Sequence, residues 1–190
     1  MKTTTIHLRN MCCQRCIEAV TGELQSIGLN LRNVRLGEVR YAPSDKITLS
    51  RIKTVLNNRG FLLIKNEEEI LVEKIKTATL DLVHRLAEME KSDFVFSTYL
   101  EEQIKVPYRT LSKTFSRHRN FTVEKYFILL KLEKAKDLID NSILKFSEIA
   151  WAMGYNSPQH LSTQFKKFTG MTMQDYKKSR KKHRKLIETI

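Results

Sequence analysis

The chain has 190 residues, a formal net charge of +13 and 41% hydrophobic residues, which suffices for two small domains with a core each. It contains no apolar run long enough to span a membrane, and its first residues lack the apolar stretch of a secretory signal, so we expect a cytoplasmic protein. Its three cysteines, an odd number between positions 12 and 16, argue against a disulfide framework.

The charge is distributed unevenly along the chain. Residues 1–66 contain 11 basic and 4 acidic residues, residues 67–106 contain 5 and 10, and residues 107–190 contain 18 and 7. A C-terminal segment this basic favours a polyanionic partner, of which nucleic acid is the usual one. A well-solvated basic surface has the same composition, so the charge alone does not identify the partner.

Residues 1–65 are expected to form an α+β domain with the role of a sensor. Alternating and helical apolar patterns predict four strands and two helices in the order βαββαβ. The strands are expected at 2–8, 31–36, 38–42 and 61–64, and the helices at 16–28 and 49–60. Gly37 is expected to turn the hairpin, and Gly60 to close the second helix in the left-handed conformation. Two helices on one face of a four-stranded antiparallel sheet make a ferredoxin-like fold.

Residues 66–180 are expected to form a separate all-α domain, followed by a basic tail at 181–190. A polar helix with an acidic first turn is predicted at 66–91, and the domain boundary at 65–68. No stretch rich in Gly, Ser or Pro separates the two domains. The domains are therefore expected to be coupled through a helix.

The C-terminal half contains an internal repeat with an offset of 50 residues. The residues that recur are Ser97, Leu111, Ser112, Phe115, Thr122 and Tyr126, which match Ser147, Leu161, Ser162, Phe165, Thr172 and Tyr176. Each copy predicts a short helix, a brief turn and a second helix. These helices are expected at 97–104 and 109–118 in the first copy, and at 147–153 and 159–168 in the second. Each copy is therefore predicted to be a helix-turn-helix.

The second helix of each copy is predicted to have one buried and one exposed face. The residues expected to point inward are Leu111, Phe115 and His118 in the first copy, and Leu161, Phe165 and Phe168 in the second. The opposite faces carry hydrogen-bonding and cationic side chains, which suit base edges and phosphates. Trp151 is expected in the core. A connecting helix of about 18 residues within 122–141, roughly 27 Å long, is expected to hold the two second helices about 34 Å apart, one turn of DNA.

Residues 67–180 resemble the DNA-binding domain of the AraC family of bacterial transcription regulators, which is a pair of helix-turn-helix units joined by a linker helix. The resemblance rests on Ile149, Ala150, Gly154, Tyr155, Ser157, Leu161, Phe165, Lys166, Gly170, Thr172 and Tyr176. The DNA-binding residues that it implies are Arg109, Thr110, Ser112, Lys113, Arg117, Gln159, His160, Ser162, Thr163 and Lys167.

The same resemblance implies double-stranded promoter DNA and RNA polymerase as partners, allows a homodimer, and implies no enzymatic activity. The first unit departs from the family pattern at two positions. Asn120 stands where Gly is common, and Lys131 stands where Arg is common. Because Asn tolerates the left-handed conformation, we expect the turn at Asn120 to survive.

All three cysteines lie in the segment NMCCQRC, between the first predicted strand and the first predicted helix. A thiol at a helix N-terminus has a lowered pKa because the helix dipole and free N–H groups stabilise its thiolate. Cys13 and Cys16 are three positions apart, so their sulfurs are expected to converge. Soft thiolates favour Cu(I), Zn(II) and similar ions, and a pair of them suits the low coordination number of Cu(I).

This loop and the βαββαβ order of residues 2–64 resemble the heavy-metal-associated domain of copper chaperones and metal-pumping ATPases. The resemblance implies that Cys13 and Cys16 ligate the metal and that Met11 packs beneath the loop. Asn10 stands where Gly is usual, and Cys12 stands where Thr is usual. Cys12 is either a third ligand or a small apolar residue.

The leading hypothesis is a transcription regulator whose DNA binding responds to a thiophilic metal. Other readings of the cysteines are a thiol redox-responsive regulator and a retained fold without a ligand. A methyl-acceptor repair protein of the Ada type also joins a cysteine site to AraC-like helices, but it uses four spread cysteines. A metallochaperone whose basic half docks an acidic protein conflicts with the repeated helix-turn-helix.

Overall fold

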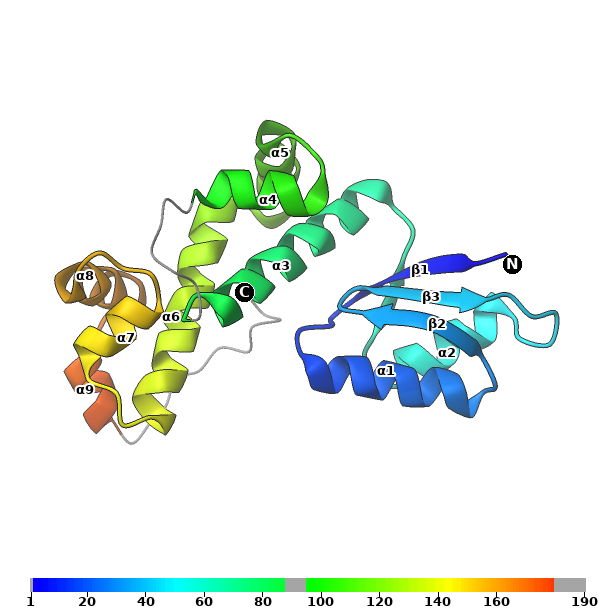
Figure 1. Ribbon diagram of the computed structural model, residues 1–190, viewed down its shortest axis with the longest axis horizontal. Helices are drawn as coiled ribbons and strands as arrows, with labels where there is room; N and C mark the ends of the chain where they lie inside the picture. The colour runs from blue at the N-terminus through cyan, green and yellow to red at the C-terminus, as the bar shows by residue number, and fades with distance from the viewer. Residues whose placement is uncertain (1, 88–94, 180–190) are drawn as a thin grey trace. The chain divides into compact units, whose positions relative to one another are not determined.

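The computed structural model describes residues 2–87 and 95–179, and the chain divides into two units at Thr77 and Ala78 (Figure 1). The sequence predicts the boundary at 65–68 instead. The division falls within a single helix, α3 (Glu67–Arg85), so each unit contains part of it.

Ion pairs to strand β1 (Thr4–Arg9) explain why the first half of α3 belongs to the first unit. Arg9 Nη2 lies 3.0 Å from Glu69 Oε2, and Arg9 Nε lies 3.7 Å from Glu73 Oε1. The boundary is therefore about ten residues later than the sequence predicts, because acidic residues at the start of α3 are paired with the sheet. The helix ends at Arg85 rather than at residue 91, and positions 88–91 lie outside the described residues.

The first unit confirms the predicted order of strands and helices. Its elements are β1, α1 (Gln14–Ser26), β2 (Asn30–Arg35), β3 (Glu38–Ala42), α2 (Leu49–Asn57) and β4 (Leu62–Ile64), followed by the start of α3. The sheet has the order β2-β3-β1-β4, and every neighbouring pair is antiparallel. Helices α1 and α2 lie on the same face of this sheet (Figure 1).

The core of the first unit follows from two periodicities. Alternate residues of the strands and residues three or four apart on the helices point into the same layer. The buried residues are Ile6 and Leu8 on β1, Val39 and Tyr41 on β3, Val20 and Leu24 on α1, and Ile52 and Leu56 on α2. Gly37 and Gly60 have φ angles of 75° and 82°, which confirms the predicted turn and helix end.

The second unit is helical. Its elements are the end of α3, α4 (Phe96–Ile104), α5 (Tyr108–Arg119), α6 (Val123–Asn141), α7 (Phe146–Ala152), α8 (Pro158–Thr169) and α9 (Met173–Lys178). Helices α4 and α5 form the first predicted helix-turn-helix, α7 and α8 form the second, and α6 connects them (Figure 1). Helix α9 is not predicted from the sequence.

The 50-residue repeat extends into the helix that follows each helix-turn-helix. Thr122 Oγ1 accepts a hydrogen bond from Lys125 N (3.2 Å) at the start of α6. Thr172 Oγ1 accepts one from Asp175 N (3.1 Å) at the start of α9. Both threonines are N-caps, so the repeated unit contains three helices rather than two.

Two aromatic pairs hold these third helices in place. The rings of Phe115 and Tyr126 have centroids 5.4 Å apart, and those of Phe165 and Tyr176 have centroids 5.6 Å apart. All four side chains are buried. The recurrence of Phe and Tyr in the sequence is therefore the recurrence of one packing contact.

Two predictions about side-chain direction are wrong. His118 is exposed, and Thr114, one turn earlier on α5, is buried in its place. Trp151 is 42% exposed because Ile149, Ala150 and Met153 occupy the buried face of α7. A helical step of 100° per residue places Trp151 about 200° from Ile149, which is the solvent side.

The predicted basic tail at 181–190 lies outside the described residues. Within residues 2–87 and 95–179, no helix combines the length and apolar character that crossing a lipid bilayer requires.

Candidate functional site

The start of α8 is fixed by two residues with different tasks. Ser157 is the N-cap, and its Oγ accepts a hydrogen bond from His160 N (3.2 Å). Pro158 occupies the first helical position, where its missing N–H costs nothing. At the start of α5, Glu101 of the preceding helix accepts a hydrogen bond from Tyr108 N. Both second helices therefore begin at defined positions, directly before the residues predicted to contact DNA.

The residues predicted to contact DNA lie on the accessible faces of α5 and α8. The exposed ones are Arg109, Thr110, Lys113 and Arg117 on α5, and Gln159, His160, Ser162, Thr163 and Lys167 on α8, and Ser112 is half-buried. The opposite faces hold Leu111, Phe115, Leu161 and Phe165, which are fully buried. The predicted residues therefore lie opposite the buried faces of the two helices.

Charge distinguishes α5 and α8 from ordinary amphipathic helices. Neither helix contains an Asp or Glu, whereas the connecting helix α6 contains both. Basic residues occupy the last turn of each, namely Arg117, His118 and Arg119 in α5 and Lys166 and Lys167 in α8. An exposed helix face with cations and without carboxylates attracts a polyanion over its whole length.

His160 has partners within its own unit, which the sequence does not predict. Its ring lies edge-on to Tyr155, with centroids 5.3 Å apart, and its Nε2 lies 3.3 Å from Gln164 Nε2. Tyr155 donates a hydrogen bond from its hydroxyl to Gln164 Oε1 (2.8 Å), and burial raises the pKa of that hydroxyl. These contacts orient the His160 ring at the start of α8. The i, i+4 spacing of His160 and Gln164 is the only sequence signal for them.

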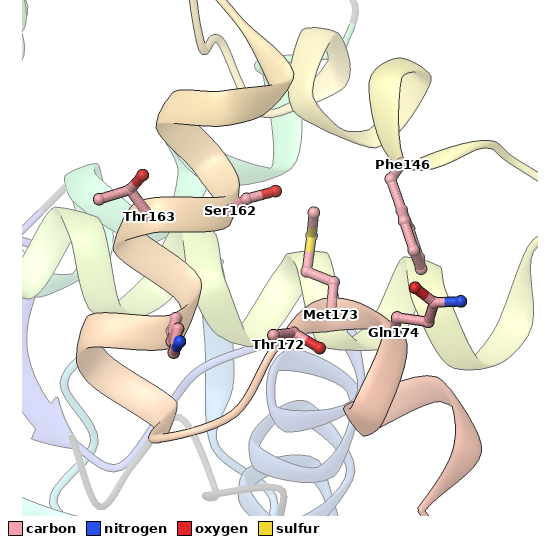
Figure 2. Close-up of a pocket in the computed structure, with 7 residues that line it drawn as sticks. Phe146, Ser162, Thr163, Thr172, Met173 and Gln174 are labelled. Carbon is pink, nitrogen blue, oxygen red and sulfur yellow. The ribbon is translucent and has the colours of Figure 1, made fainter.

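A groove of about 380 Å³ lies beside α8, and α9 forms its other wall (Figure 2). The residues that line it are Phe146, Ser162, Thr163, Lys166, Thr172, Met173 and Gln174. Figure 2 shows Phe146 reaching from the start of α7 toward Gln174, with Ser162 facing the same space. Lys166 and Gln174 are therefore further candidates for polar contacts. The Thr172 and Asp175 capping pair is the signal that would have revealed this wall.

The start of the cysteine loop is held in place by Asn10 and Met11. Asn10 has a φ angle of 73°, the left-handed conformation that glycine adopts most easily, and its Nδ2 donates a hydrogen bond to Gly60 O (2.9 Å). Met11 is buried in the core beneath the loop, as the resemblance to heavy-metal-associated domains implies. Asn10 therefore takes the backbone conformation of the usual glycine and adds an anchor to the end of α2.

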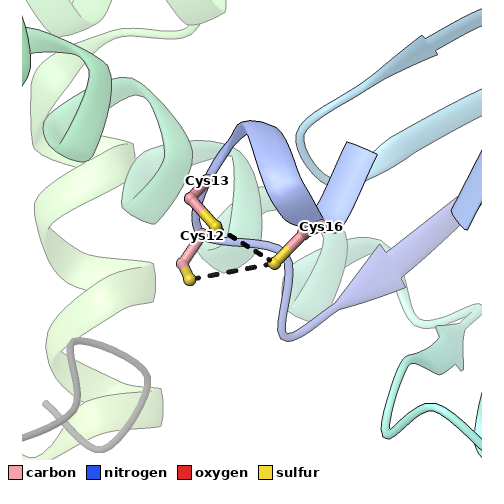
Figure 3. Close-up of side chains that lie close together, drawn as sticks. All are labelled: Cys12, Cys13 and Cys16. Atoms are coloured by element: carbon pink, nitrogen blue, oxygen red, sulfur yellow. Dashed lines mark hydrogen bonds between the residues drawn. The ribbon is translucent and has the colours of Figure 1, made fainter. Parts of the chain in front are cut away.

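The three thiols converge at the start of α1. Cys13 Sγ lies 3.6 Å from Cys16 Sγ, and Cys12 Sγ lies 3.9 Å from Cys16 Sγ (Figure 3). All three sulfurs lie within 4.8 Å of one another, and each residue is half-buried. Among the described residues, no carboxylate or imidazole joins this group. A donor set of sulfur alone fits a soft, thiophilic ion and does not fit Mg²⁺ or Ca²⁺.

The pKa of the Cys13 thiol is lowered, although not all contributions act in that direction. Burial raises this pKa, but the nearby backbone N–H groups of Cys16 and Arg15 and the neighbouring thiols of Cys16 and Cys12 outweigh it. These donors stabilise the thiolate, as expected for the N-cap of a helix. Cys13 is therefore suited to nucleophilic attack and to metal binding, because the thiolate is the reactive form in both.

Comparison with known proteins finds similarity in the second unit. Residues 100–179 match the family described as a helix-turn-helix domain. The chain is 34% identical over 68 residues to the HTH-type transcriptional activator RhaS of Pectobacterium atrosepticum, which covers 36% of this chain and 24% of that protein. It is 25% identical over 134 residues to histidine kinase P4 of Formosa agariphila, which covers 66% of this chain and 10% of that protein.

Among solved structures, the C-terminal domain of AraT, a response regulator from Geobacillus stearothermophilus, is 20% identical with a TM-score of 0.48. That similarity covers 60% of this chain and 89% of that domain. The chain spans about a quarter of the length of RhaS and a tenth of the length of the histidine kinase (24% and 10%).

Proposed function

We propose that the chain is a sequence-specific, DNA-binding transcription regulator of the AraC type, and not an enzyme. The observation that carries this proposal is the duplicated helix-turn-helix, in which both second helices expose polar and cationic side chains and lack carboxylates. The match of residues 100–179 to a helix-turn-helix family and the similarity to the activator RhaS support it. Double-stranded promoter DNA is the proposed ligand, and RNA polymerase and a second copy of the chain are further expected partners.

The connecting helix α6 supports a two-segment reading of DNA. It has 19 residues, which corresponds to about 28 Å. Tyr126 near its start contacts Phe115 of α5, and Asp140 near its end lies 3.4 Å from the hydroxyl of Tyr176 in α9. Each end of α6 is therefore packed against one helix-turn-helix. A spacer of this length is close to the roughly 34 Å between successive major-groove segments on one side of a duplex.

The side chains at the starts of α5 and α8 provide complementary chemistry. Arg109 and Lys113 suit guanine O6 and N7, while Gln159 suits the N6 and N7 of adenine. Arg117 and Lys167, later on the same helices, suit phosphates, which position the protein without reporting sequence. The first two turns of each helix are therefore proposed to contact base edges, and the last turns are proposed to contact phosphates.

Selection of binding sites from a random pool of duplexes tests the proposal with the full chain. We expect enrichment of a bipartite site whose halves lie roughly 10 base pairs apart. The logarithm of the affinity for the selected site should fall linearly with the logarithm of salt concentration. Failure to enrich any sequence, combined with equal binding to heparin and to DNA, would refute base readout.

For the first unit, we propose a ferredoxin-like, heavy-metal-associated-like domain that binds a thiophilic metal ion such as Cu(I) through Cys13 and Cys16. The βαββαβ order, the sheet order and the sulfur-only donor set support this proposal. When bound, the ion would cross-link the loop to the first turn of α1 through metal–sulfur bonds to Cys13 and Cys16. Metal changes DNA affinity only if it binds two arrangements of the chain with different affinity.

Anaerobic titration with Cu(I) tests metal binding, and a promoter reporter tests its consequence. Cys13→Ser together with Cys16→Ser should abolish stoichiometric Cu(I) binding and leave the circular dichroism spectrum unchanged. The same double substitution should remove the response of a target promoter to copper. Retained stoichiometric binding would exclude these two ligands, and an unchanged promoter response would separate the first unit from DNA control.

The 3.6 Å between the sulfurs of Cys13 and Cys16 favours a thiol redox switch as a second candidate. Oxidation of both thiols by glutathione disulfide would give one disulfide and two molecules of glutathione, and the sulfurs would approach to about 2.05 Å. Mass spectrometry after incubation in glutathione redox buffers distinguishes the candidates. If the disulfide forms only at potentials more oxidising than that of the cytosol, metal binding remains the proposed function.

A further inference from the structure

We infer that Cys12 is a third ligand, so that the cysteine loop holds a thiophilic ion by three thiolates. This inference rests on the metal binding proposed above for Cys13 and Cys16 and defines the coordination of that site. It assigns Cys12 the role of a ligand rather than that of a small apolar residue.

The distances between the sulfurs fit three-coordination better than two. With metal–sulfur bonds of about 2.3 Å, a trigonal ion separates its sulfurs by about 4.0 Å, and a linear ion separates two sulfurs by about 4.6 Å. The observed separations are 3.6 Å for Cys13 and Cys16 and 3.9 Å for Cys12 and Cys16, and the sulfurs of Cys12 and Cys13 lie within 4.8 Å of each other. A linear ion would have to push Cys13 and Cys16 apart by about 1 Å, whereas a trigonal ion requires changes in separation of at most about 0.8 Å.

The packing of the loop argues against a role for Cys12 as a core residue. Met11 is buried in the core of the first unit, and Cys16 packs against that core. Within the described residues, Cys12 does not belong to the core cluster or to the apolar side chains that pack against it. Its sulfur lies beside that of Cys16 instead, turned toward the same point as the sulfur of Cys13 (Figure 3).

The backbone at the start of the loop positions Cys12. The left-handed Asn10 reverses the chain after β1, and its hydrogen bond to Gly60 O holds that reversal. Cys13 then has extended backbone angles (φ −156°, ψ 173°) before α1 begins. From these positions the sulfurs of both adjacent cysteines lie within 4.8 Å of the sulfur of Cys16.

Three thiolates from one chain change what the site does. A metal carrier that passes its ion to a partner needs an open coordination position for the partner's ligand. A third thiolate from the same chain fills that position and slows the exchange. The site is therefore built to retain an ion, as a sensor requires, and it accepts soft ions that tolerate three sulfur ligands.

The test compares Cys12→Ser with the wild-type full chain, both loaded anaerobically with Cu(I). Gln14→Ser, an exposed substitution at the first residue of α1, between Cys13 and Cys16, is the matched control. X-ray absorption counts the sulfur neighbours of copper, and competition with a chromogenic Cu(I) chelator measures affinity. We expect three sulfurs in the wild type and in Gln14→Ser, and two in Cys12→Ser. The affinity of Cys12→Ser should fall by at least about tenfold, since loss of even an outer partner of a ligand costs 10- to 100-fold.

Light scattering shows whether each loaded sample is a single chain, because a second chain also supplies sulfur. Two sulfurs in the wild type, with unchanged affinity in Cys12→Ser, would overturn the third ligand and leave the two-thiolate site standing. Three sulfurs retained in monomeric Cys12→Ser would overturn it too. Absence of stoichiometric Cu(I) binding in the wild type would overturn the proposed metal site itself, so the two failures are distinguishable.

Discussion

The ammonium group of Lys131 in α6 lies 3.9 Å from the centre of the Tyr155 ring, which belongs to the turn of the second helix-turn-helix. A second ring, that of Phe127, lies 4.9 Å from the same ammonium group. Lys131 is 9% exposed, and its burial lowers its pKa to about 8. The two rings favour the charged form and oppose this effect. This contact joins α6 to the second helix-turn-helix. Lys131 stands where an arginine is common in the AraC-type pattern.

Replacing Lys131 with Met should therefore stabilise the second unit at neutral pH. The folded pKa of about 8 lies below the ordinary value of 10.5, so the unfolded chain binds more protons between these values. The wild type consequently gains stability as pH rises through that window, and below it carries the full cost of burying the charge. That cost is on the order of 3 kcal/mol, reduced by the contribution of the rings.

Urea unfolding at pH 7 and pH 9.5 measures the effect, with fluorescence of Trp151 as a probe of the second unit. Trp151 is the only tryptophan in the chain. Lys131→Met should exceed the wild type in free energy of unfolding at pH 7, and the difference should shrink at pH 9.5. Lys125→Met, an exposed substitution on the same helix, should show no such pH dependence. A difference that is the same at both pH values would contradict the assigned pKa.

Lys113→Ala and Gln159→Ala should each weaken binding to the selected duplex far more than binding to random DNA. The expected loss is about 1–3 kcal/mol for each, because each side chain is proposed to contact a base edge. Fluorescence anisotropy with both duplexes at one salt concentration measures it. Lys53→Ala in α2 and Gln103→Ala in α4 remove the same chemical groups from exposed positions outside α5 and α8. Equal losses on both duplexes would assign Lys113 and Gln159 to the phosphate backbone.

The elements of both units follow from local patterns in the sequence. Alternating residues such as Ile6 and Leu8 specify a strand, and the recurrence of Phe115 as Phe165 specifies a repeated packing contact. What a local pattern misses depends on tertiary partners. The 100° helical step places His118 on the same side of α5 as Leu111, but His118 lies in the last turn of that helix and is exposed. Trp151 is apolar, but it lies opposite the buried face of α7.

The same limit applies to the candidate sites. The spacing of Cys13 and Cys16 predicts converging sulfurs because three residues make nearly one helical turn. The position of Cys12, which precedes the helix, depends on the hydrogen bond between Asn10 and Gly60, fifty residues apart in the chain. The wall that α9 adds beside α8 is a tertiary feature too, and only the cap at Thr172 marks it in the sequence.

Asn120→Gly should stabilise the second unit, and Asn120→Ala should destabilise it. Asn120 ends α5 with a φ angle of 58°, and Gly170 ends α8 at the equivalent position with a φ angle of 80°. An alanine in the left-handed region costs about 1–2 kcal/mol, whereas glycine adopts it freely. Urea unfolding followed by Trp151 fluorescence should therefore rank Gly above Asn and Asn above Ala at position 120. Gly170→Ala should cost a similar amount, and a neutral Asn120→Ala would show that the turn is not held left-handed in solution.

Substitutions of Asn10 distinguish two contributions to the cysteine loop, namely its left-handed backbone conformation and its hydrogen bond to Gly60 O. Asn10→Gly keeps the left-handed backbone but removes the hydrogen bond to Gly60 O, which contributes about 1 kcal/mol. Asn10→Ala removes the hydrogen bond and adds the left-handed penalty of about 1–2 kcal/mol. Thermal unfolding by circular dichroism should therefore rank the first unit as wild type, Gly and Ala in decreasing stability. Affinity for Cu(I), measured by chelator competition, should fall in the same order, because a looser loop holds Cys12 and Cys13 less firmly beside Cys16. Unequal stabilities with equal Cu(I) affinities would mean that the ion alone organises the three sulfurs, and that the fold beneath the loop does not prepare the site.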